Sequence, residues 1–305
     1  MTIALGLAWA AAVPAGAAPA TAAPAPAAPA TAAPTWQVVD DEGHSIRMTH
    51  PARRIVALSP GATAMLFAAG GGDRIVGTAH FSVEPAAARK IARIGDAHGF
   101  DLERIVALHP DVVVAWSGGA SAAQLAPLEH AGLVVYRHRV VRLGDVAPSI
   151  ERLGALLGTQ QIAHAAATAL QARIEALRLL HRSAAPPRVL VQVWDRPVYT
   201  VGGAQLISDA VEVCGYRNLF GDLSDPAPAV ALEAIAARDP DAILALAADP
   251  QMARDWLQRW HALPSLRAVQ RGALLSFVDA RLSRLGPEVV DATEDLCRVL
   301  AGANR

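Results

Sequence analysis

The strongest constraint on the fold is a regular alternation of short apolar segments with segments of helical pattern. In the first half of the chain the predicted strands are residues 55–58, 75–77, 112–116 and 133–136, and the predicted helices are residues 64–69, 102–108 and 122–131. Such strands, rich in valine and isoleucine, are typical of parallel sheets that helices cover on both faces. We therefore expect an α/β fold.

A long segment without any strand pattern interrupts this alternation. Residues 148–182 carry apolar residues at helical spacing and contain no proline after Pro148. At about 1.5 Å per residue, one helix of this length would exceed about 45 Å, more than a small domain needs. Strand pattern resumes at residues 189–193. The sequence thus predicts two Rossmann-like α/β lobes joined by a single long α-helix, with a ligand cleft between the lobes.

An internal match supports the two lobes. Residues 102–114 (LERIVALHPDVVV) resemble residues 232–244 (LEAIAARDPDAIL), and both read as a helix, a Pro-Asp turn and a strand. Their offset far exceeds the period of a solenoid repeat, so we interpret the match as lobe duplication or as convergent packing. We place an N-terminal β-hairpin in residues 35–53, the first lobe in 54–147, the interlobe helix in 148–184 and the second lobe in 185–305.

The first 34 residues have the composition of a leader and a tether. Residues 3–13 form a short apolar run, and Ala15-Gly16-Ala17 follows as an A-x-A cleavage pattern, which is typical of a secretory signal peptide. No lysine or arginine precedes the run, so a start upstream of Met1 or an unprocessed leader remains an alternative. Residues 10–34 contain only alanine, proline, threonine, glycine and valine, as in a flexible tether. We expect the protein to be exported.

The chain has two cysteines, Cys214 and Cys297. In an exported protein an even pair predicts a disulfide. The alternative is two buried thiols that pack as small apolar side chains. A disulfide would close a loop of about 80 residues and stabilise the fold by about 3–5 kcal/mol.

Charge and motif content exclude several classes of function. With 27 basic and 28 acidic residues the chain has no excess of positive charge, so nucleic acid is not an expected partner. The sequence lacks a nucleophile elbow, a P-loop, a dinucleotide-binding fingerprint, a paired-cysteine zinc pattern and an H-E-x-x-H helix. We therefore expect no enzyme, no catalytic residue and no catalytic cofactor. The opposing hypothesis is an exported α/β enzyme in which Asp96, His98 and Asp279 meet in the cleft.

Aromatic residues make up only 5% of the chain, and four of them lie at the ends of predicted strands. They are Phe81 and Trp116 in the first lobe, and Trp194 and Tyr199 in the second. Ligands of α/β folds bind beyond the carboxyl ends of the strands, so we expect these side chains to stack on a flat apolar ligand in the cleft. The alternative is that Trp116 closes the core of the first lobe.

Further candidates lie at the same strand ends. They are Pro60, Gly61, His80, His98, Asp279 and Arg284. Asp279 and Arg284 are expected to hydrogen-bond the edges of the ligand, or alternatively to pair at the surface. His80 and His98 are either polar residues of the pocket or ligands of a metal or haem.

Four stretches of the sequence resemble one known family. They are Arg54–Pro60 (RIVALSP), Asp101–Asp111 (DLERIVALHPD), Ala115–Gly119 (AWSGG) and Val211–Gly215 (VEVCG). Together they resemble the helical-backbone periplasmic binding proteins of ABC importers, and the similarity extends over nearly all of residues 54–300. Within that family, which binds vitamin B12, haem or ferric siderophores, the sequence is most similar to the members that bind vitamin B12.

The resemblance implies a monomeric periplasmic receptor with little hinge motion, which holds a cobalamin-like corrinoid between its lobes. It implies as partners an ABC permease dimer with its ATPase subunits. Trp116 matches a ligand-stacking tryptophan, Phe81 a stacking tyrosine and Asp279 an amide-binding aspartate, while Cys214 and Cys297 match a disulfide of the family. Ala97 and Ala227 differ, because they stand where the vitamin B12 binders have pocket tryptophans.

Haem and ferric siderophores are the alternative ligands. Haem binders of the family usually supply an axial tyrosine from the loop that here reads His80–Pro85 (HFSVEP), and this loop has no tyrosine. His80 is therefore predicted to bind a metal only if the ligand is haem.

Two glutamates are candidates for docking on the transporter. Glu103 and Glu233 occupy equivalent places in the two matched segments, and by resemblance they match the glutamates through which the vitamin B12 binders contact permease arginines. The alternative is that each carboxylate only stabilises the N-terminus of its own helix.

Overall fold

The computed structural model describes residues 36–96, 99–118 and 122–302. The predicted signal peptide and tether, and the candidate His98, lie outside these residues. The described chain begins with the predicted hairpin, in which β1 (Trp36–Val39) pairs antiparallel with β2 (Ser45–Met48). Alternate residues of the hairpin, Val38 and Ile46, are buried in the core of the first lobe.

The N-terminal lobe is built on a four-stranded parallel sheet of order β4-β3-β7-β8. Its strands are β3 (Ile55–Ala57), β4 (Ile75–Thr78), β7 (Val112–Trp116) and β8 (Val135–His138), and its helices are α1 (Pro60–Ala68), α2 (Leu102–Ala107) and α3 (Ala122–His130). Strand β8 begins two residues later than predicted, after the turn at Gly132. A short hairpin of β5 (Gly95–Asp96) and β6 (Gly99–Phe100) follows the second strand.

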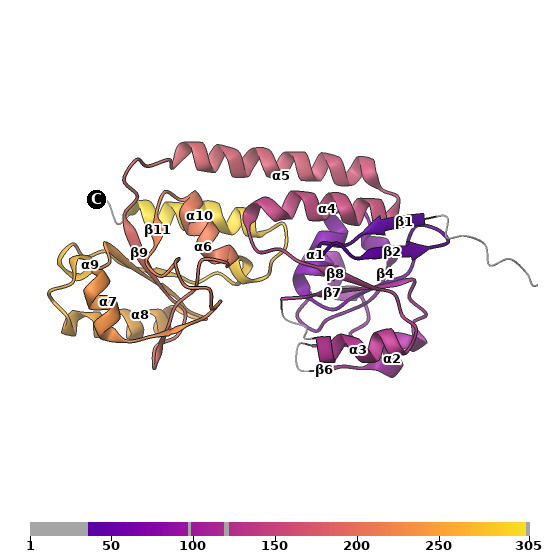
Figure 1. The fold of residues 1–305 in the computed structure, drawn as a ribbon, viewed down its shortest axis with the longest axis horizontal. Helices are drawn as coiled ribbons and strands as arrows, with labels where there is room; N and C mark the ends of the chain where they lie inside the picture. The colour runs from indigo at the N-terminus through magenta and orange to yellow at the C-terminus, as the bar shows by residue number, and fades with distance from the viewer. Residues whose placement is uncertain (1–35, 97–98, 119–121, 303–305) are drawn as a thin grey trace, which may run out of the picture. The chain divides into compact units, whose positions relative to one another are not determined.

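Both faces of this sheet are buried, which explains its continuous apolar strands. Val112 and Val114 of β7 pack in the core under α1 and α4 (Leu143–Leu157), whereas Val113 and Ala115 pack toward α2 and α3. Figure 1 shows α1 and α4 on one side of the strands and α2 and α3 on the other. The predicted two-sided α/β lobe is confirmed.

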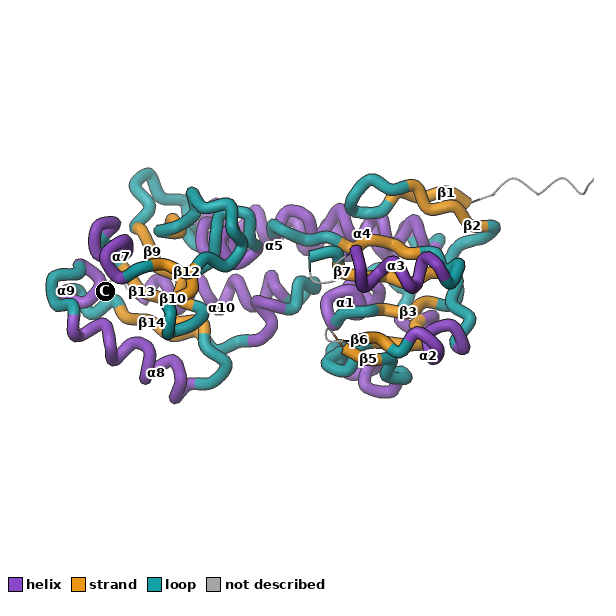
Figure 2. The backbone as a smooth tube through the Cα atoms, turned by 60° about the horizontal axis from the view of Figure 1, so that its bottom comes forward, coloured by secondary structure: helices purple, strands orange, loops and turns teal. Residues whose placement is uncertain are grey.

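The C-terminal lobe repeats the topology of the first, with a parallel sheet of order β11-β9-β13-β14. Its strands are β9 (Arg188–Gln192), β11 (Arg217–Asn218), β13 (Ala242–Leu246) and β14 (Leu274–Phe277), and its helices are α6 (Leu206–Val213), α7 (Leu232–Arg238), α8 (Pro250–Arg259), α9 (Arg267–Gln270) and α10 (Val289–Ala301). An additional small ribbon of β10 (Val198–Tyr199) and β12 (Ala229–Val230) lies in this lobe (Figure 2).

The internal match of the sequence corresponds to a structural equivalence. His109 and Asp239 occupy equivalent positions just after α2 and α7, and both adopt a left-handed backbone, with φ of 45° and 46°. The Pro-Asp turns that follow are tied in the same way, because Asp111 accepts a hydrogen bond from the backbone N–H of Arg54 and Asp241 accepts one from that of Arg188. The two lobes are therefore two versions of one unit.

The prediction of one uninterrupted helix over residues 148–182 is wrong. The segment contains two helices, α4 and α5 (Gln160–Leu180), because Gly158 adopts a left-handed backbone with φ of 71° and ends α4. The chain then reverses, and α5 packs on α4 so closely that a Cβ on Gly154 would come within 2.2 Å of the Cβ of Ala163. Helix α5 is the long helix that runs alongside α4 and on to the second lobe (Figure 1).

Several contacts hold the lobes together in addition to the covalent connection through α5. One apolar core is continuous from Ile55 through Ile150 and Ile174 to Val189. Arg173 of α5 forms ion pairs with two carboxylates of α10, at 2.5 and 2.7 Å. None of the helices in the described ranges is both long enough and apolar enough to span a membrane.

Candidate ligand-binding site

Phe81 lies in the loop that follows β4 and is 71% exposed. Hydrogen bonds among buried hydroxyl groups connect the loop to the lobe, since Thr63 Oγ1 lies 2.6 Å from Thr78 Oγ1 and 3.1 Å from Ser82 Oγ. Arg93 donates from one guanidinium nitrogen to two carbonyl oxygens of the same loop, at 2.9 and 3.2 Å. A rigid loop that holds an aromatic ring in solvent is typical of a binding surface.

Trp116 is the last residue of β7 and is half-buried. Its indole ring packs on the backbone of Gly118, where an added Cβ would lie 2.7 Å from the indole nitrogen. The ring is therefore held at the carboxyl end of the sheet and is partly open to solvent, which fits neither a fully buried core residue nor a free surface residue.

Trp194 follows β9 in the second lobe and is 55% exposed. Its ring meets the ring of Trp256 edge-on, with centroids 6.3 Å apart and an interplanar angle of 62°. The half-buried Tyr199 lies opposite Trp194 across a tight hairpin, and its N–H donates to the Trp194 carbonyl at 3.3 Å. Trp260 supports the same hairpin, because its indole N–H donates to the buried Gln192 at 2.9 Å.

Trp256 and Trp260 were not among the sequence candidates. They lie at the end of α8 and in the short helix that follows it, four residues apart, so their rings share one helical face toward the Trp194 hairpin. That spacing was the available signal for them.

Asp279 is already engaged within the protein. Its carboxylate accepts the backbone N–H of Arg281 and two guanidinium nitrogens of that residue, the shortest contact being 2.5 Å. These hydrogen bonds lower the pKa of Asp279 below its ordinary value. Arg281, which also binds Asp295 at 2.5 Å, is the partner that sequence reasoning missed.

Pro60 and Gly61 lie in the first turn of α1, where Ser59 caps the helix. Gly61 is buried against the second lobe, because a Cβ there would come within 2.1 Å of the carbonyl oxygen of Arg284. Gly61 and Arg284 are thus brought together, as a contact between the lobes.

His80 is exposed, and its backbone N–H donates to the carbonyl of Gly95 at 2.9 Å. Within the described residues no group of three or more histidine, cysteine, aspartate or glutamate side chains is arranged to hold a metal ion.

The profile of the periplasmic binding protein family matches residues 55–277. The vitamin B12-binding protein of Vibrio cholerae serotype O1 (strain ATCC 39541 / Classical Ogawa 395 / O395) is 30% identical over 256 residues, which are 84% of this chain and 91% of that protein. The chain belongs to the periplasmic binding protein family. The vitamin B12-binding protein of Vibrio vulnificus (strain CMCP6) is 30% identical over 252 residues, 82% of this chain and 91% of that protein.

Solved structures of the family share this fold. The crystal structure of the periplasmic vitamin B12 binding protein BtuF of Vibrio cholerae matches with a TM-score of 0.74 and 29% identity, over 84% of this chain and 99% of that one. The periplasmic haem-binding protein BhuT in complex with two haems matches with a TM-score of 0.71 and 22% identity, over 83% and 99%. The predicted family and the predicted two-lobed fold are confirmed.

As a periplasmic binding protein, the chain is a member of a family of substrate-binding components of ABC importers. Glu103 and Glu233 are both exposed, and each lies in the first turn of its helix, α2 or α7. Figure 1 shows both helices on the side of their lobes away from α5. The predicted docking carboxylates are therefore accessible.

The predicted disulfide is present. Cys214 at the end of α6 is bonded to Cys297 in α10, with their α-carbons 4.8 Å apart. The bond ties the last helix of this binding protein to the body of the second lobe.

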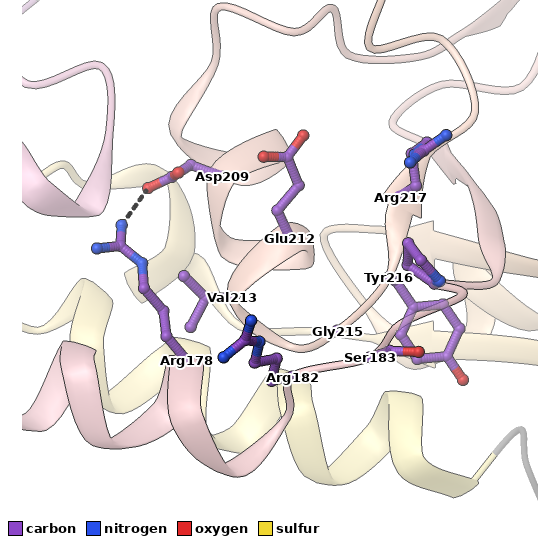
Figure 3. A pocket seen from close by; sticks show the side chains of 10 residues that line it. Arg178, Arg182, Ser183, Asp209, Glu212, Val213, Gly215, Tyr216 and Arg217 are labelled. Atoms are coloured by element: carbon purple, nitrogen blue, oxygen red, sulfur yellow. Dashed lines mark ion pairs between the residues drawn. The ribbon is translucent and has the colours of Figure 1, made fainter.

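A separate hollow of about 440 Å³ lies between the end of α5 and α6 (Figure 3). Its lining is of mixed charge, with Arg178 3.8 Å from the buried Asp209 and with Glu212 nearby. Burial, and then the neighbouring charge of Asp209, raise the pKa of Glu212. None of the predicted ligand-binding residues lines this hollow, and its charged walls do not suit a flat apolar ligand.

Proposed function

We propose that the protein is a periplasmic receptor that captures a cobalamin-like corrinoid between its two lobes and delivers it to an ABC importer. The observation that carries the proposal is the set of accessible aromatic rings at the strand ends of both lobes: Phe81, Trp116 and Trp194. The names of the relatives at 30% identity, vitamin B12-binding proteins, support the same ligand.

The chemistry of the site fits binding without catalysis. A corrin is a broad, largely flat ring with amide groups at its edge, so its faces suit aromatic side chains and its periphery suits hydrogen-bonding groups. Each buried tryptophan or phenylalanine covers about 150–250 Å². Asp279 and Arg284 are proposed to meet the amide edge, with Arg281 holding the Asp279 carboxylate in place.

The lobes are proposed to keep their relative positions during capture. The continuous apolar core, the Arg173 ion pairs and the close contact of Gly61 with Arg284 all resist a large hinge opening. A receptor of this kind uses a preformed cleft, which reduces the entropic cost of binding.

We also propose that the leader exports the protein and that the protein is a monomer in the periplasm. Its proposed partner is a permease dimer with ATPase subunits. The family membership supports the location and the kind of partner.

Haem is the second candidate ligand, with ferric siderophores behind it. The exposed imidazole of His80, adjacent to Phe81 on the same loop, favours haem, because imidazole is a common axial ligand of haem iron. Members of the fold that are named haem-binding proteins are consistent with this alternative.

The proposal is tested by adding cyanocobalamin, haem or a ferric siderophore to the purified protein and recording visible spectra after gel filtration. We expect corrin bands to elute with the protein in equimolar amount. Elution of haem alone with the protein, and a change in its Soret band on His80→Ala, would establish the second candidate instead. Elution of none of the three would reject the proposal.

A further inference from the structure

An apolar pocket lies on the second lobe between the Trp194 hairpin, the start of α7 and α8. It has a volume of about 460 Å³, within the range of roughly 300–1,000 Å³ of functional pockets. Its apolar walls are formed by Pro197, Val230, Leu232, Trp256, Trp260 and Leu263. We call it the α7–α8 pocket.

The walls of the α7–α8 pocket are held in place by contacts of the protein itself. Asp195 of the hairpin forms an ion pair with Arg259 of α8. The indole N–H of Trp260 is bonded to Gln192, and Trp256 meets Trp194 edge-on. The pocket is thus preformed, and a side chain that enters it does not first have to order its walls.

One wall of the pocket adjoins Glu233, one of the two carboxylates predicted to dock on the transporter. Leu232 lines the pocket, is 49% exposed, and is followed directly in the first turn of α7 by Glu233. A partner that pairs with the Glu233 carboxylate therefore also reaches the mouth of the pocket. Interfaces derive most of their binding energy from a few large side chains that fill such pockets, with charged groups around them.

We propose that the α7–α8 pocket receives an apolar side chain from a periplasmic segment of the permease when the protein docks. The inference rests on the proposed function for the identity of the partner. The apolar side chain anchors the C-terminal lobe, while Glu233 sets the register by pairing with a cation on the same permease segment.

The test measures the affinity of the mature protein for the complex of permease and ATPase subunits of the proposed vitamin B12 importer. This complex is reconstituted in nanodiscs. Leu232→Asp introduces a charge into the pocket, and Ala262→Trp fills it from its exposed rim. The matched controls are Leu179→Asp and Ala169→Trp, two exposed positions of α5 that lie neither in the pocket nor on the helices of Glu103 and Glu233. We expect both pocket variants to dock at least about tenfold more weakly, the loss typical of an interface anchor, and both controls to dock like the unchanged protein.

Cobalamin affinity of the free protein is measured for every variant, because it reports on the proposed function separately from docking. The docking comparison itself uses the ligand-free protein, so failure to bind cobalamin leaves it intact. Docking of the two pocket variants with unchanged affinity would overturn the inference. A second result would also overturn the inference: sedimentation shows that the unchanged protein is a dimer, and Leu232→Asp abolishes the dimer but not docking. That result would assign the pocket to a second copy of the chain.

Discussion

Gly61 and Arg284 form a close contact between the two lobes, since a Cβ built on Gly61 would lie 2.1 Å from the carbonyl oxygen of Arg284. The backbone of Leu285 lies 3.0 Å from the same point, so the contact has no flexible side chain that can move aside. The first turn of α1 therefore packs directly on the backbone of the second lobe.

Gly61→Ala is expected to force the lobes apart or to distort α1. We expect the free energy of unfolding to fall by about 1–3 kcal/mol, as for other overpacked sites, and cobalamin affinity to fall with it. Gly144→Ala is the control, because Gly144 also lies in a helix and has no atom within 4 Å of an added Cβ. Urea denaturation in which both variants have the same stability would contradict the prediction.

Trp116→Ala is expected to weaken ligand binding by about 1–3 kcal/mol, the scale of losing a large stacked aromatic contact. Because the ring is only half-buried, the melting temperature should change little by comparison. Calorimetric titration with cyanocobalamin measures the first quantity and differential scanning calorimetry the second. Unchanged affinity together with a large loss of stability would assign Trp116 to the core of the first lobe, the alternative reading of its position.

The alternation of strands and helices was predictable because the central strands of both sheets, β3, β7 and β13, are apolar along their whole length. The chain reversal at Gly158 could not be predicted from the sequence. A single glycine costs a helix only about 1 kcal/mol relative to alanine, so the local sequence permits either a continuous helix or a break. The close packing of Gly154 on Ala163, a contact that exists only after the reversal, favours the break.

In the candidate site, too, some features could be predicted from the sequence and others could not. Phe81, Trp116 and Trp194 could be chosen as candidates from the sequence, because each follows or ends a predicted strand and ligands of α/β folds bind at strand ends. The pairing of Asp279 with Arg281 and the support of Trp194 by Trp256 depend on how the chain is folded around them, and residue type alone does not reveal them.

The disulfide is expected to contribute about 3–5 kcal/mol to stability, because it closes a loop between residues 83 positions apart. Mass spectrometry of the unreduced protein should find no thiol that reacts with iodoacetamide. The double change Cys214→Ala and Cys297→Ala should lower the melting temperature and leave cobalamin affinity nearly unchanged, since neither sulfur lies at the predicted ligand site. Two alkylated thiols in protein isolated from the periplasm would contradict the prediction.

Asp41 makes part of the stability dependent on pH. Its buried carboxylate accepts hydrogen bonds from Ser149 Oγ at 2.6 Å and from the backbone N–H of Arg139 at 2.9 Å, and it lies 3.0 Å from His138 Nδ1. Burial alone would raise the pKa of Asp41, but the hydrogen bond and charge of His138, with the other donors, lower it overall.

A pKa that is lower in the folded than in the unfolded protein stabilises the fold above the unfolded value, about 3.9, and this contribution is lost as the pH falls through the folded value. Asp41→Asn should therefore cost roughly 2–3 kcal/mol of unfolding free energy at pH 7, the scale of hydrogen bonds to a charged group. The difference should shrink below about pH 4. Asp73→Asn, at an exposed turn, controls for the loss of a surface charge. A pH-independent difference in urea denaturation would refute this assignment.

Glu103 and Glu233 lie at equivalent positions of the two lobes, in the first turns of α2 and α7, and both carboxylates are exposed. Two separated negative charges related by pseudo-symmetry suit a partner built from two identical subunits. Each carboxylate also lies near the positive end of its helix, which is worth about 0.3–1 kcal/mol to the helix itself.

The double change Glu103→Ala and Glu233→Ala separates these two roles. If the carboxylates dock the protein, transport and ligand-dependent ATPase stimulation in the reconstituted importer should be abolished, because charge pairs at an interface govern association rate and register. Cobalamin affinity and melting temperature should barely change, since neither residue lies at the predicted ligand site and the loss of helix stabilisation is small. Glu129→Ala, an exposed glutamate on α3 of the first lobe, tests whether any lost negative charge has the same effect. Full transport by the double variant would reject the docking role, whereas a large drop in melting temperature would assign both carboxylates to stabilising their helices.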